Sequence, residues 1–292
     1  MIDYKKIFKD RELRLQLISG LKYIPTKPYL KAVYWIKTGR HLNLDNPKTF
    51  CDKLNWLKVN DIHPEYTELV DKINVRPYVN SIMGEDMFFP LYGAWEHYKD
   101  IDFDELPEKF VLKCNHDSGS VKIIKSKSDI DHEELNKFFE DRLKLNPYVI
   151  GREYPYKNVK PMIMAEAYMT PQGEEDINDY KFFCFNGKPE IMFIATDRST
   201  DVKFDFFDMD FNHLDIVNIH PQSGNEIEKP KNFDKMVEIA AKLSQGMKFV
   251  RIDLYDVNGK IYFGEYTFFH GGGFWPFSPT EWEKKLGDLI EI

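Results

Sequence analysis

Cysteine is scarce in this chain. Among its 292 residues it has only three, Cys51, Cys114 and Cys184. Their number is odd, they lie far apart, and none belongs to a CxxC or a Cys/His spacing. The sequence therefore predicts neither a disulfide framework nor a zinc site, and it favours a reducing, cytoplasmic compartment.

Long apolar runs and the best-known nucleotide fingerprints are also missing. No segment approaches the roughly 18 uninterrupted apolar residues of a membrane span, and the first residues lack the apolar core of a signal peptide. Neither the Walker pattern GxxxxGK[ST] nor the dinucleotide pattern GxGxxG occurs. These absences predict a soluble protein, peripheral to a membrane at most, without either of those two loops.

Negative charge is in excess overall, but not everywhere. The net charge of −8 argues against general nucleic-acid binding. Residues 1–40 nevertheless hold ten Lys and Arg against three Asp and Glu, a net charge of +7 that leaves −15 for the rest. Tyr23, Tyr29, Tyr34 and Trp35 lie among these cations. We expect this segment either to pack on the rest of the protein with its charges outward or to rest on the inner face of an anionic membrane.

Helical spacing of apolar residues dominates the start of the chain. It predicts helices over about 11–24, 27–39, 46–60, 64–83, 130–144 and 231–246. Asn46 before Pro47 predicts the N-cap of the third helix. Asp131 with Glu134 three residues later forms a capping-box pattern at the start of the fifth.

Strand-like patterns fill most of the remainder, from about residue 88 onward. They predict strands over 162–168, 180–186 and 189–196, a strand–loop–strand over 110–127, and a strand pair within 203–219. Hairpins that alternate with helices indicate an α+β fold rather than a parallel dinucleotide-binding fold.

The segment 249–268 carries the strongest local signal. Asn258-Gly259 between alternating apolar residues predicts a tight hairpin, because both residues tolerate positive φ. We expect this hairpin to bring Asp253 and Glu265 together as a hard-oxygen site for Mg²⁺ and phosphate. Arg251 and Thr267 share the alternation of these acids and extend the polar patch. The alternative is an edge ribbon whose acids face water.

Three further segments carry polar residues at strand ends. The loop 115–120 follows Lys113 and contains Ser and Gly, which suit phosphate oxygens, although an ordinary hairpin loop has the same composition. Glu166 ends a buried strand and either meets a nucleotide or faces solvent. Asp179 and Lys181 share a strand face, where they form an ion pair or contact phosphate.

Taken together and in this order, these segments resemble the ATP-grasp superfamily. The amino-acid sequence over roughly residues 45–280 is similar to the TupA-like (teichuronopeptide biosynthesis) branch, which is found with genes for cell-surface polysaccharides. The stretches that carry the resemblance are DKINVRPYV, KCNHDSGS, DYKFFCFNGKP and VRIDLYDVNGKIYFGEYTF, followed by a glycine run. The resemblance implies an ATP-grasp fold of two α+β subdomains that hold ATP between them, over 106–180 and 181–292, after a helical region over 1–105.

The resemblance also implies the contacts of the nucleotide. The phosphates are expected to meet Lys113, Ser118, Gly119, Ser120 and Lys181. The adenine and ribose are expected to lie beside Glu166, the Ala167 backbone and Tyr168.

For the metal and the chemistry, the resemblance implies a second group of residues. Asp253 and Glu265 match the magnesium carboxylates, whereas Thr267 stands where most ATP-grasp enzymes have Asn, which leaves a second metal ion open. His270 adjoins the glycine run beside the hairpin and is the best candidate among the histidines. The catalytic candidates are therefore Arg251, Lys181 and His270.

The expected activity is an ATP-dependent ligation of a carboxylate and an amine through an acylphosphate, with ATP and Mg²⁺ as cofactors. The substrates would be of the uronic acid and amino acid type, belonging to a capsule or another surface polysaccharide or its precursor. A sugar kinase would use the same nucleotide site. A glycosyltransferase is a further alternative, based on the DxD pattern Asp208-Met209-Asp210, and a module that binds ATP without turnover is another.

Overall fold

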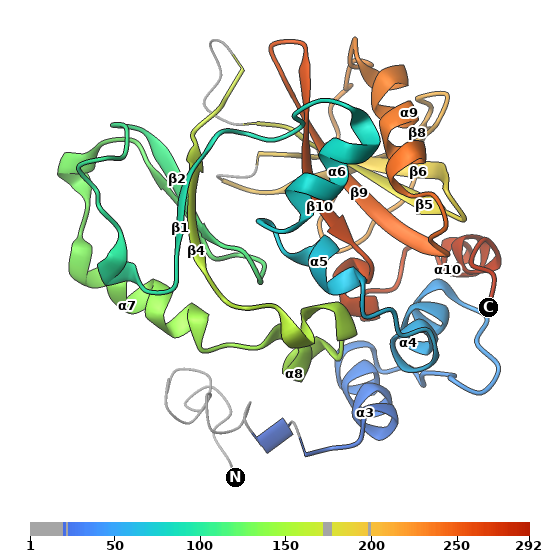
Figure 1. The fold of residues 1–292 in the computed structure, drawn as a ribbon. Helices are drawn as coiled ribbons and strands as arrows, with labels where there is room; N and C mark the ends of the chain where they lie inside the picture. Colours follow the sequence, from blue (N-terminus) through green and yellow to red (C-terminus); the bar gives the residue numbers. More distant parts are fainter. Residues whose placement is uncertain (1–19, 22, 172–176, 198–199) are drawn as a thin grey trace.

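A computed structural model describes residues 20–21, 23–171, 177–197 and 200–292 (Figure 1). They form two antiparallel sheets with helices packed against them, which confirms the α+β prediction. The helix expected over 11–24 lies mostly outside the described residues. No helix of the described part is long and apolar enough to cross a membrane.

The helices before the first sheet differ from the prediction at their boundaries. They are α3 (Thr26–Thr38), α4 (Phe50–Asn60), α5 (Tyr66–Val70) and α6 (Val75–Met83). The N-cap predicted at Asn46 is wrong: α4 starts after Thr49, which forms a capping box with Asp52 and thereby satisfies two free backbone N–H groups. The single helix expected over 64–83 is broken at Asp71, whose side chain accepts from the backbone N–H groups of Ile73 and Asn74.

The first sheet has the strand order β1-β4-β2-β3. Its strands are β1 (Leu91–Trp95), β2 (Phe110–Cys114), β3 (Val121–Ile124) and β4 (Ile163–Ala167). Helix α7 (His132–Leu143) covers one face with Leu135 and Phe139, and Asp131 caps it by accepting from the N–H of Glu134, as predicted. Short elements border this sheet: η1 (Tyr98–Asp100), η2 (Lys127–Asp129), α8 (Pro147–Gly151) and η3 (Tyr154–Asn158).

The second sheet has six strands in the order β10-β9-β5-β6-β7-β8. They are β5 (Asp179–Phe185), β6 (Lys188–Thr196), β7 (Lys203–Asp208), β8 (His213–Leu214), β9 (Phe249–Val257) and β10 (Lys260–Thr267). Helix α9 (Phe233–Leu243) packs on it, and the chain ends with η4 (His270–Gly273) and α10 (Glu281–Asp288). Strand β1 lies within residues 1–105, in the strand-like stretch expected from about residue 88, and pairs with β4 of the first sheet.

Candidate active site

The β9–β10 hairpin brings Asp253 and Glu265 to the same face of the second sheet through a bulge. Asn258 and Gly259 both have positive φ, 53° and 83°, as the predicted tight turn requires. Regular pairing from this turn would set Asp253 opposite Gly264 and turn Glu265 to the other face. The register instead shifts between Phe263 and Glu265, so that Glu265 pairs with Asp253. The extra residue is Gly264, where a Cβ would lie 3.0 Å from the backbone oxygen of Asp253.

Arg251 contacts each of the other three members of the polar patch. Its Nε and Nη2 donate to the two carboxylate oxygens of Asp253, each over 2.6 Å. The same Nη2 lies 3.2 Å from Glu265 Oε1 and 3.0 Å from the hydroxyl oxygen of Thr267. The expected convergence of these four side chains is therefore present, while the roles given to them stay predictions.

Lys181 lies opposite Asp253 on the neighbouring strand β5 and completes a charge-balanced cluster. Its Nζ pairs with Asp253 Oδ2 and lies 2.7 Å from Asp179 Oδ2. Burial disfavours a charged Glu265, but Lys72, Lys181 and Arg251 together lower the pKa of this carboxyl to about 2. For Asp253, burial outweighs the opposing effect of Arg251 and Lys181 and raises the pKa of the carboxyl. Three acids and three cations thus lie together at one place.

His270 is buried beneath Arg251 and positions it. Arg251 Nη1 donates to His270 Nδ1 over 2.8 Å, and His270 Nε2 lies 2.8 Å from Asn218 Oδ1. This arrangement requires a neutral ring with its proton on Nε2. Burial, and then Arg251 and Lys181, lower the pKa of His270 well below its usual value, so the ring accepts a hydrogen bond from Arg251 rather than supplying a proton.

The glycine run after His270 forms a left-handed turn. Gly271, Gly272 and Gly273 all have positive φ, between 57° and 66°. The carbonyls of Gly272 and Gly273 accept from Lys58 and Asn55 on α4, so the run is fixed against that helix. Glycine is needed here because L-residues with a Cβ adopt this conformation at a cost. The turn therefore holds His270 in place under Arg251.

On the opposite side, the first sheet contributes Lys113 and the loop 115–120. Lys113 Nζ pairs with Glu166 Oε1, and Arg76 Nη2 lies 3.7 Å from the other oxygen of that carboxylate. Ser120 is buried and donates to Asp117, whereas Ser118 and Gly119 are exposed at the tip of the loop. Of the predicted loop residues, these two are therefore the ones that face open space.

A cleft of about 440 Å³ lies between these two sides. From the first sheet it is lined by Lys113 and residues 117–121, and from the second by Asp179, Lys181, Arg251, Asp253 and Glu265. His270 lies at its wall, and its far end is apolar, with Phe193, Ala195, Val202, Phe204 and Ile219. Among the described residues, Glu166, Ala167 and Tyr168 do not line the cleft. Glu166 contacts Lys113, which does line it, and the backbone N–H of Ala167 donates to the Pro90 oxygen.

Sequence reasoning missed Lys72, which connects both sides of the cleft. Its Nζ donates to the backbone oxygen of Asp117 over 2.7 Å and lies 3.9 Å from Glu265 Oε2. The residue belongs to the stretch DKINVRPYV that supported the resemblance. Lys72 directly follows Asp71, the acid that interrupts the helical pattern. A charged residue at such a break is the sequence signal that could have indicated a site residue here.

The apolar end of the cleft contains a strained turn. Ile219 has a φ of 61°, and His220 N donates to Asn218 O, only two residues back, over 2.7 Å. A left-handed conformation costs a residue with a Cβ about 1–2 kcal/mol. Asn218 is held from two directions, by His270 and by the oxygen of Trp275, and these contacts impose the turn. The contacts of Asn218 therefore hold the turn that places the Ile219 side chain at the cleft.

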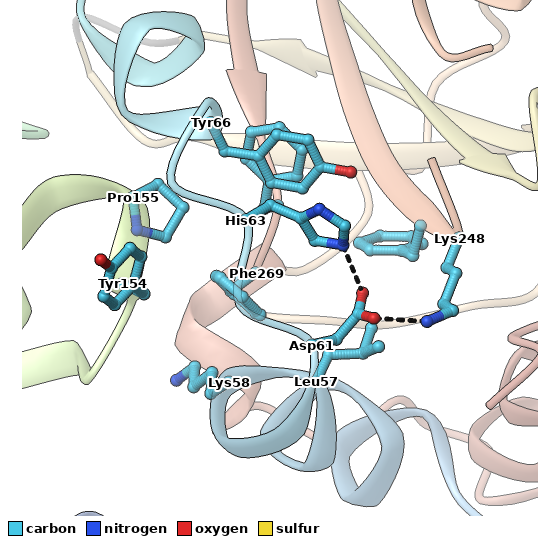
Figure 2. Close-up of a pocket in the computed structure, with 11 residues that line it drawn as sticks. Leu57, Lys58, Asp61, His63, Tyr66, Tyr154, Pro155, Lys248 and Phe269 are labelled. Carbon is cyan, nitrogen blue, oxygen red and sulfur yellow. Dashed lines mark hydrogen bonds and ion pairs between the residues drawn. The ribbon is translucent and has the colours of Figure 1, made fainter. Parts of the chain in front are cut away.

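A second pocket, shown in Figure 2, lies at the base of the hairpin. Asp61 pairs with Lys248 and lies 3.3 Å from His63 Nε2, while Tyr66 stacks on Phe268 with ring centroids 4.1 Å apart. Its volume of about 20 Å³ accommodates little more than one water molecule. It fixes the segment after α4 against β10 and offers no room for a substrate.

The DxD pattern that motivated a glycosyltransferase forms a turn between β7 and β8. Asp208 accepts from the backbone N–H groups of Asp210 and Asn212 and from the Asn212 side chain, over 2.8–3.0 Å. The Asp208 carboxylate is thereby used in its own loop, and neither acid lines the cleft of the described residues. The pattern is an aspartate turn here.

The donor set of the cleft suits a hard divalent cation. In the described part of the chain no group of three or more His, Cys, Asp and Glu is arranged to hold a metal. Asp253 and Glu265 provide a pair of carboxyl groups on one face, with the Thr267 hydroxyl 3.1 Å from Glu265 Oε1. Oxygen donors of this kind fit Mg²⁺ shared with phosphates rather than a metal held by protein alone.

Comparison with solved structures gives distant likenesses, and comparison with curated proteins gives no match. D-alanine–D-alanine ligase from Bacillus anthracis complexed with ATP is 17% identical, with 68% of this chain and 53% of that chain covered and a TM-score of 0.38. For N5-carboxyaminoimidazole ribonucleotide synthetase from Thermus thermophilus the values are 9%, 68%, 45% and 0.38. For a RimK domain protein ATP-grasp from Sphaerobacter thermophilus they are 10%, 77%, 69% and 0.41. This chain spans about half the length of the first two.

The family assignment comes from the sequence itself. The model of the family described as TupA-like ATPgrasp matches residues 52–291, which is most of the chain. That range contains both sheets, the cleft and every predicted site residue. The chain therefore belongs to the TupA-like ATP-grasp family.

Proposed function

We propose that this protein is an ATP-dependent carboxylate–amine ligase. The observation that carries the proposal is the cleft in which an exposed Ser-Gly loop faces the acid pair Asp253 and Glu265, which Arg251 bridges. Phosphoryl transfer needs positioning and charge compensation more than a protein nucleophile, and the cleft offers both. The family membership supports ATP as the nucleotide.

In this proposal the triphosphate lies between the two sides of the cleft. Lys113 turns from Glu166 to the α- and β-phosphates, and Arg76 remains near the Glu166 carboxylate to compensate its charge. Ser118, Gly119 and Ser120 cover the β- and γ-phosphates, and Lys181 and Lys72 add positive charge. The adenine and ribose extend from the cleft past Lys113 towards Glu166, Ala167 and Tyr168, at the end of β4.

Asp253, Glu265 and Thr267 are the residues that would hold Mg²⁺. Glu265 is the more accessible of the two acids, since 31% of its side chain is exposed against 1% of that of Asp253. When bound, the ion supplies charge compensation for the phosphate oxygens. Both Asp253 oxygens already accept hydrogen bonds from Arg251, which fixes the orientation of this carboxylate before any ligand enters.

The chemistry proceeds in two steps. A substrate carboxylate oxygen attacks the γ-phosphorus, the bond to the β-phosphate oxygen breaks, and an acylphosphate and ADP result. An amine then attacks the acyl carbon, forms the amide and releases phosphate, with loss of a proton from the amine. Arg251 stabilises the negative charge on the transferred group, and His270 keeps Arg251 oriented by accepting from Nη1.

The acceptor is placed at the apolar end of the cleft, beside Arg251. We propose a substrate of the uronic acid and amino acid type that belongs to a cell-surface polysaccharide such as a capsule, or to its precursor; the family supports this choice. All three cysteines are free and buried, which agrees with a cytoplasmic location where ATP is supplied.

The test is product analysis with the purified protein. It is incubated with Mg-ATP and a panel that combines uronic acids with amino acids and other amines, and ADP, phosphate and amide are measured. A ligase yields all three in equal amounts and only when both substrates are present. A stable phosphoester without free phosphate would show that the protein is a sugar kinase instead. ATP binding without any turnover across the panel would show that it is a module that only binds ATP.

A further inference from the structure

Helix α3 is apolar on two opposite faces. Tyr29, Leu30 and Tyr34 are buried in a cluster with residues of α4. On the other face Trp35 and Ile36 are 55% and 73% exposed. A surface helix of a globular protein normally turns polar residues outward, whereas this outer face exposes two large apolar side chains to water.

Positive charge surrounds this outer face. Residues 23–40 contain Lys27, Lys31, Lys37 and Arg40 and no acidic residue, although the whole chain carries a net charge of −8. Of these four cations, Lys31 lies 3.6 Å from Asp45 Oδ2. The segment is held firmly on the protein: Tyr29 donates to Ile150 O over 2.7 Å, and Arg152 Nη2 to Ile24 O over 3.0 Å. The charge and the exposed aromatic ring are therefore presented at a fixed place.

Lys37 connects α3 with the aromatic residues that follow the glycine run, near the apolar end of the cleft. Lys37 Nζ lies 5.2 Å and 5.6 Å from the ring centroids of Phe274 and Trp275. Trp275 is 47% exposed, and both it and Ile219 come within 3.2 Å of the position that a Cβ on Gly271 would take. Ile219 in turn lines the cleft. We define the apolar rim as Ile24, Trp35, Ile36, Ile219 and Trp275.

We propose that the apolar rim docks onto the surface of a lipid bilayer that contains anionic lipids. Trp and Ile side chains with Lys and Arg beside them suit the interface, where the rings enter the headgroup region and the cations meet lipid phosphates. Charge complementarity selects this occupant, because the segment 23–40 carries four cations and no acidic residue in an otherwise negative protein. Docking turns the apolar end of the cleft towards the bilayer, so that an acceptor held at the membrane surface reaches Arg251. Figure 1 shows α3 at the periphery, away from α6 and α9.

The test uses the full-length protein and vesicles of two compositions, phosphatidylcholine alone and phosphatidylcholine mixed with phosphatidylglycerol. We expect co-sedimentation with the mixed vesicles, little with the neutral ones, and loss of binding as salt rises. Trp35→Ser with Ile36→Ser removes two side chains from the interface and lowers the partition coefficient about tenfold or more. Lys27→Gln with Arg40→Gln lowers binding to the mixed vesicles only.

Ile82→Ser provides the matched control, because Ile82 lies on α6 and is 37% exposed outside the rim. It is expected to bind vesicles as the wild type does. Equal binding by Trp35→Ser/Ile36→Ser, or no binding by the wild type, overturns the proposal. So does a wild-type dimer that dissociates in the double variant, which identifies a second copy as the occupant. A lower melting temperature of the double variant with unchanged vesicle binding assigns the face to contact within the chain. Vesicle binding needs no substrate, so its outcome is independent of the ligase proposal.

Discussion

The two sides of the cleft are built in different ways. On the second sheet Arg251, Asp253 and His270 are almost fully buried and hold one another with hydrogen bonds of 2.6–2.8 Å. On the first sheet Ser118 and Gly119 are exposed on a loop between two short strands. The buried side is arranged before a ligand binds, whereas the loop can adapt to it. Changes on the buried side should therefore affect folding and chemistry together, and changes on the loop should affect nucleotide binding alone.

The largest effect is expected from Asp253→Asn. The substitution removes the carboxylate that Arg251 and Lys181 share and leaves two cations in a buried place. Breaking a buried pair on one side costs about 3–5 kcal/mol. Urea unfolding should show a loss of this size, and ATP turnover should disappear. A variant with wild-type stability would mean that the cluster is more solvated than its contacts indicate, and the contrast between the two sides would be lost.

Arg251→Lys tests whether geometry or charge matters on the buried side. Lys keeps the positive charge but cannot donate to both oxygens of Asp253 and to His270 together. With the substrates that the panel identifies, kcat is expected to fall about 100- to 1,000-fold, as for the loss of one oriented donor. The KM for ATP should change little. An unchanged kcat would place the transferred phosphate elsewhere.

His270→Gln tests the buried side through pH. The pKa of His270 is lower in the folded protein than the value near 6.5 that the unfolded chain has, so the unfolded state binds the extra proton first. Stability is therefore expected to fall as pH drops below about 6.5, by up to about 1.4 kcal/mol per pH unit for this group. Gln can accept from Arg251 and donate to Asn218 but does not titrate. Urea unfolding at several pH values should show a smaller loss on acidification in the variant than in the wild type; equal losses would contradict the assignment.

Much of this fold could be predicted from local patterns, and the site only in part. The Asn258-Gly259 turn and the Asp131 cap depend on neighbouring residues and were predicted correctly. The cap at Thr49 was missed, because Asn46 before Pro47 also has the composition of a helix start. The approach of Asp253 and Glu265 was predicted, but regular pairing from the predicted turn would have separated them. The bulge at Gly264 corrects the register, and a bulge is decided by packing across the sheet rather than by the local sequence. Lys72 was missed because its partners, Asp117 and Glu265, are distant in sequence.

Gly264 offers a way to test the bulge itself. Deleting Gly264 keeps Phe263 opposite Leu254 and Glu265 opposite Asp253 in regular pairing, so the acids stay on one face. We expect the deletion to preserve binding of Mg-ATP within about tenfold, because the carboxylates remain in place. Gly264→Val is the matched comparison: its Cβ meets the oxygen of Asp253 at 3.0 Å, and it should weaken binding and stability more. A deletion more harmful than the substitution would show that the bulge does more than set the register.

The smallest effect is expected from Ser118→Ala on the loop side. Ser118 is exposed at the tip of the loop, so its removal should leave the melting temperature unchanged. The loss of one hydrogen bond to a phosphate corresponds to about 1.5–3 kcal/mol in the bound state, or about ten- to a hundredfold in the dissociation constant of Mg-ATP. Calorimetry with a non-hydrolysable ATP analogue measures it. Ser126→Ala is the control and should bind normally, because this hydroxyl lies between β3 and η2, outside the cleft, and donates to Glu108. If Ser118→Ala lowered stability as well, the loop would be part of a preformed structure, and both sides of the cleft would be organised before the nucleotide arrives.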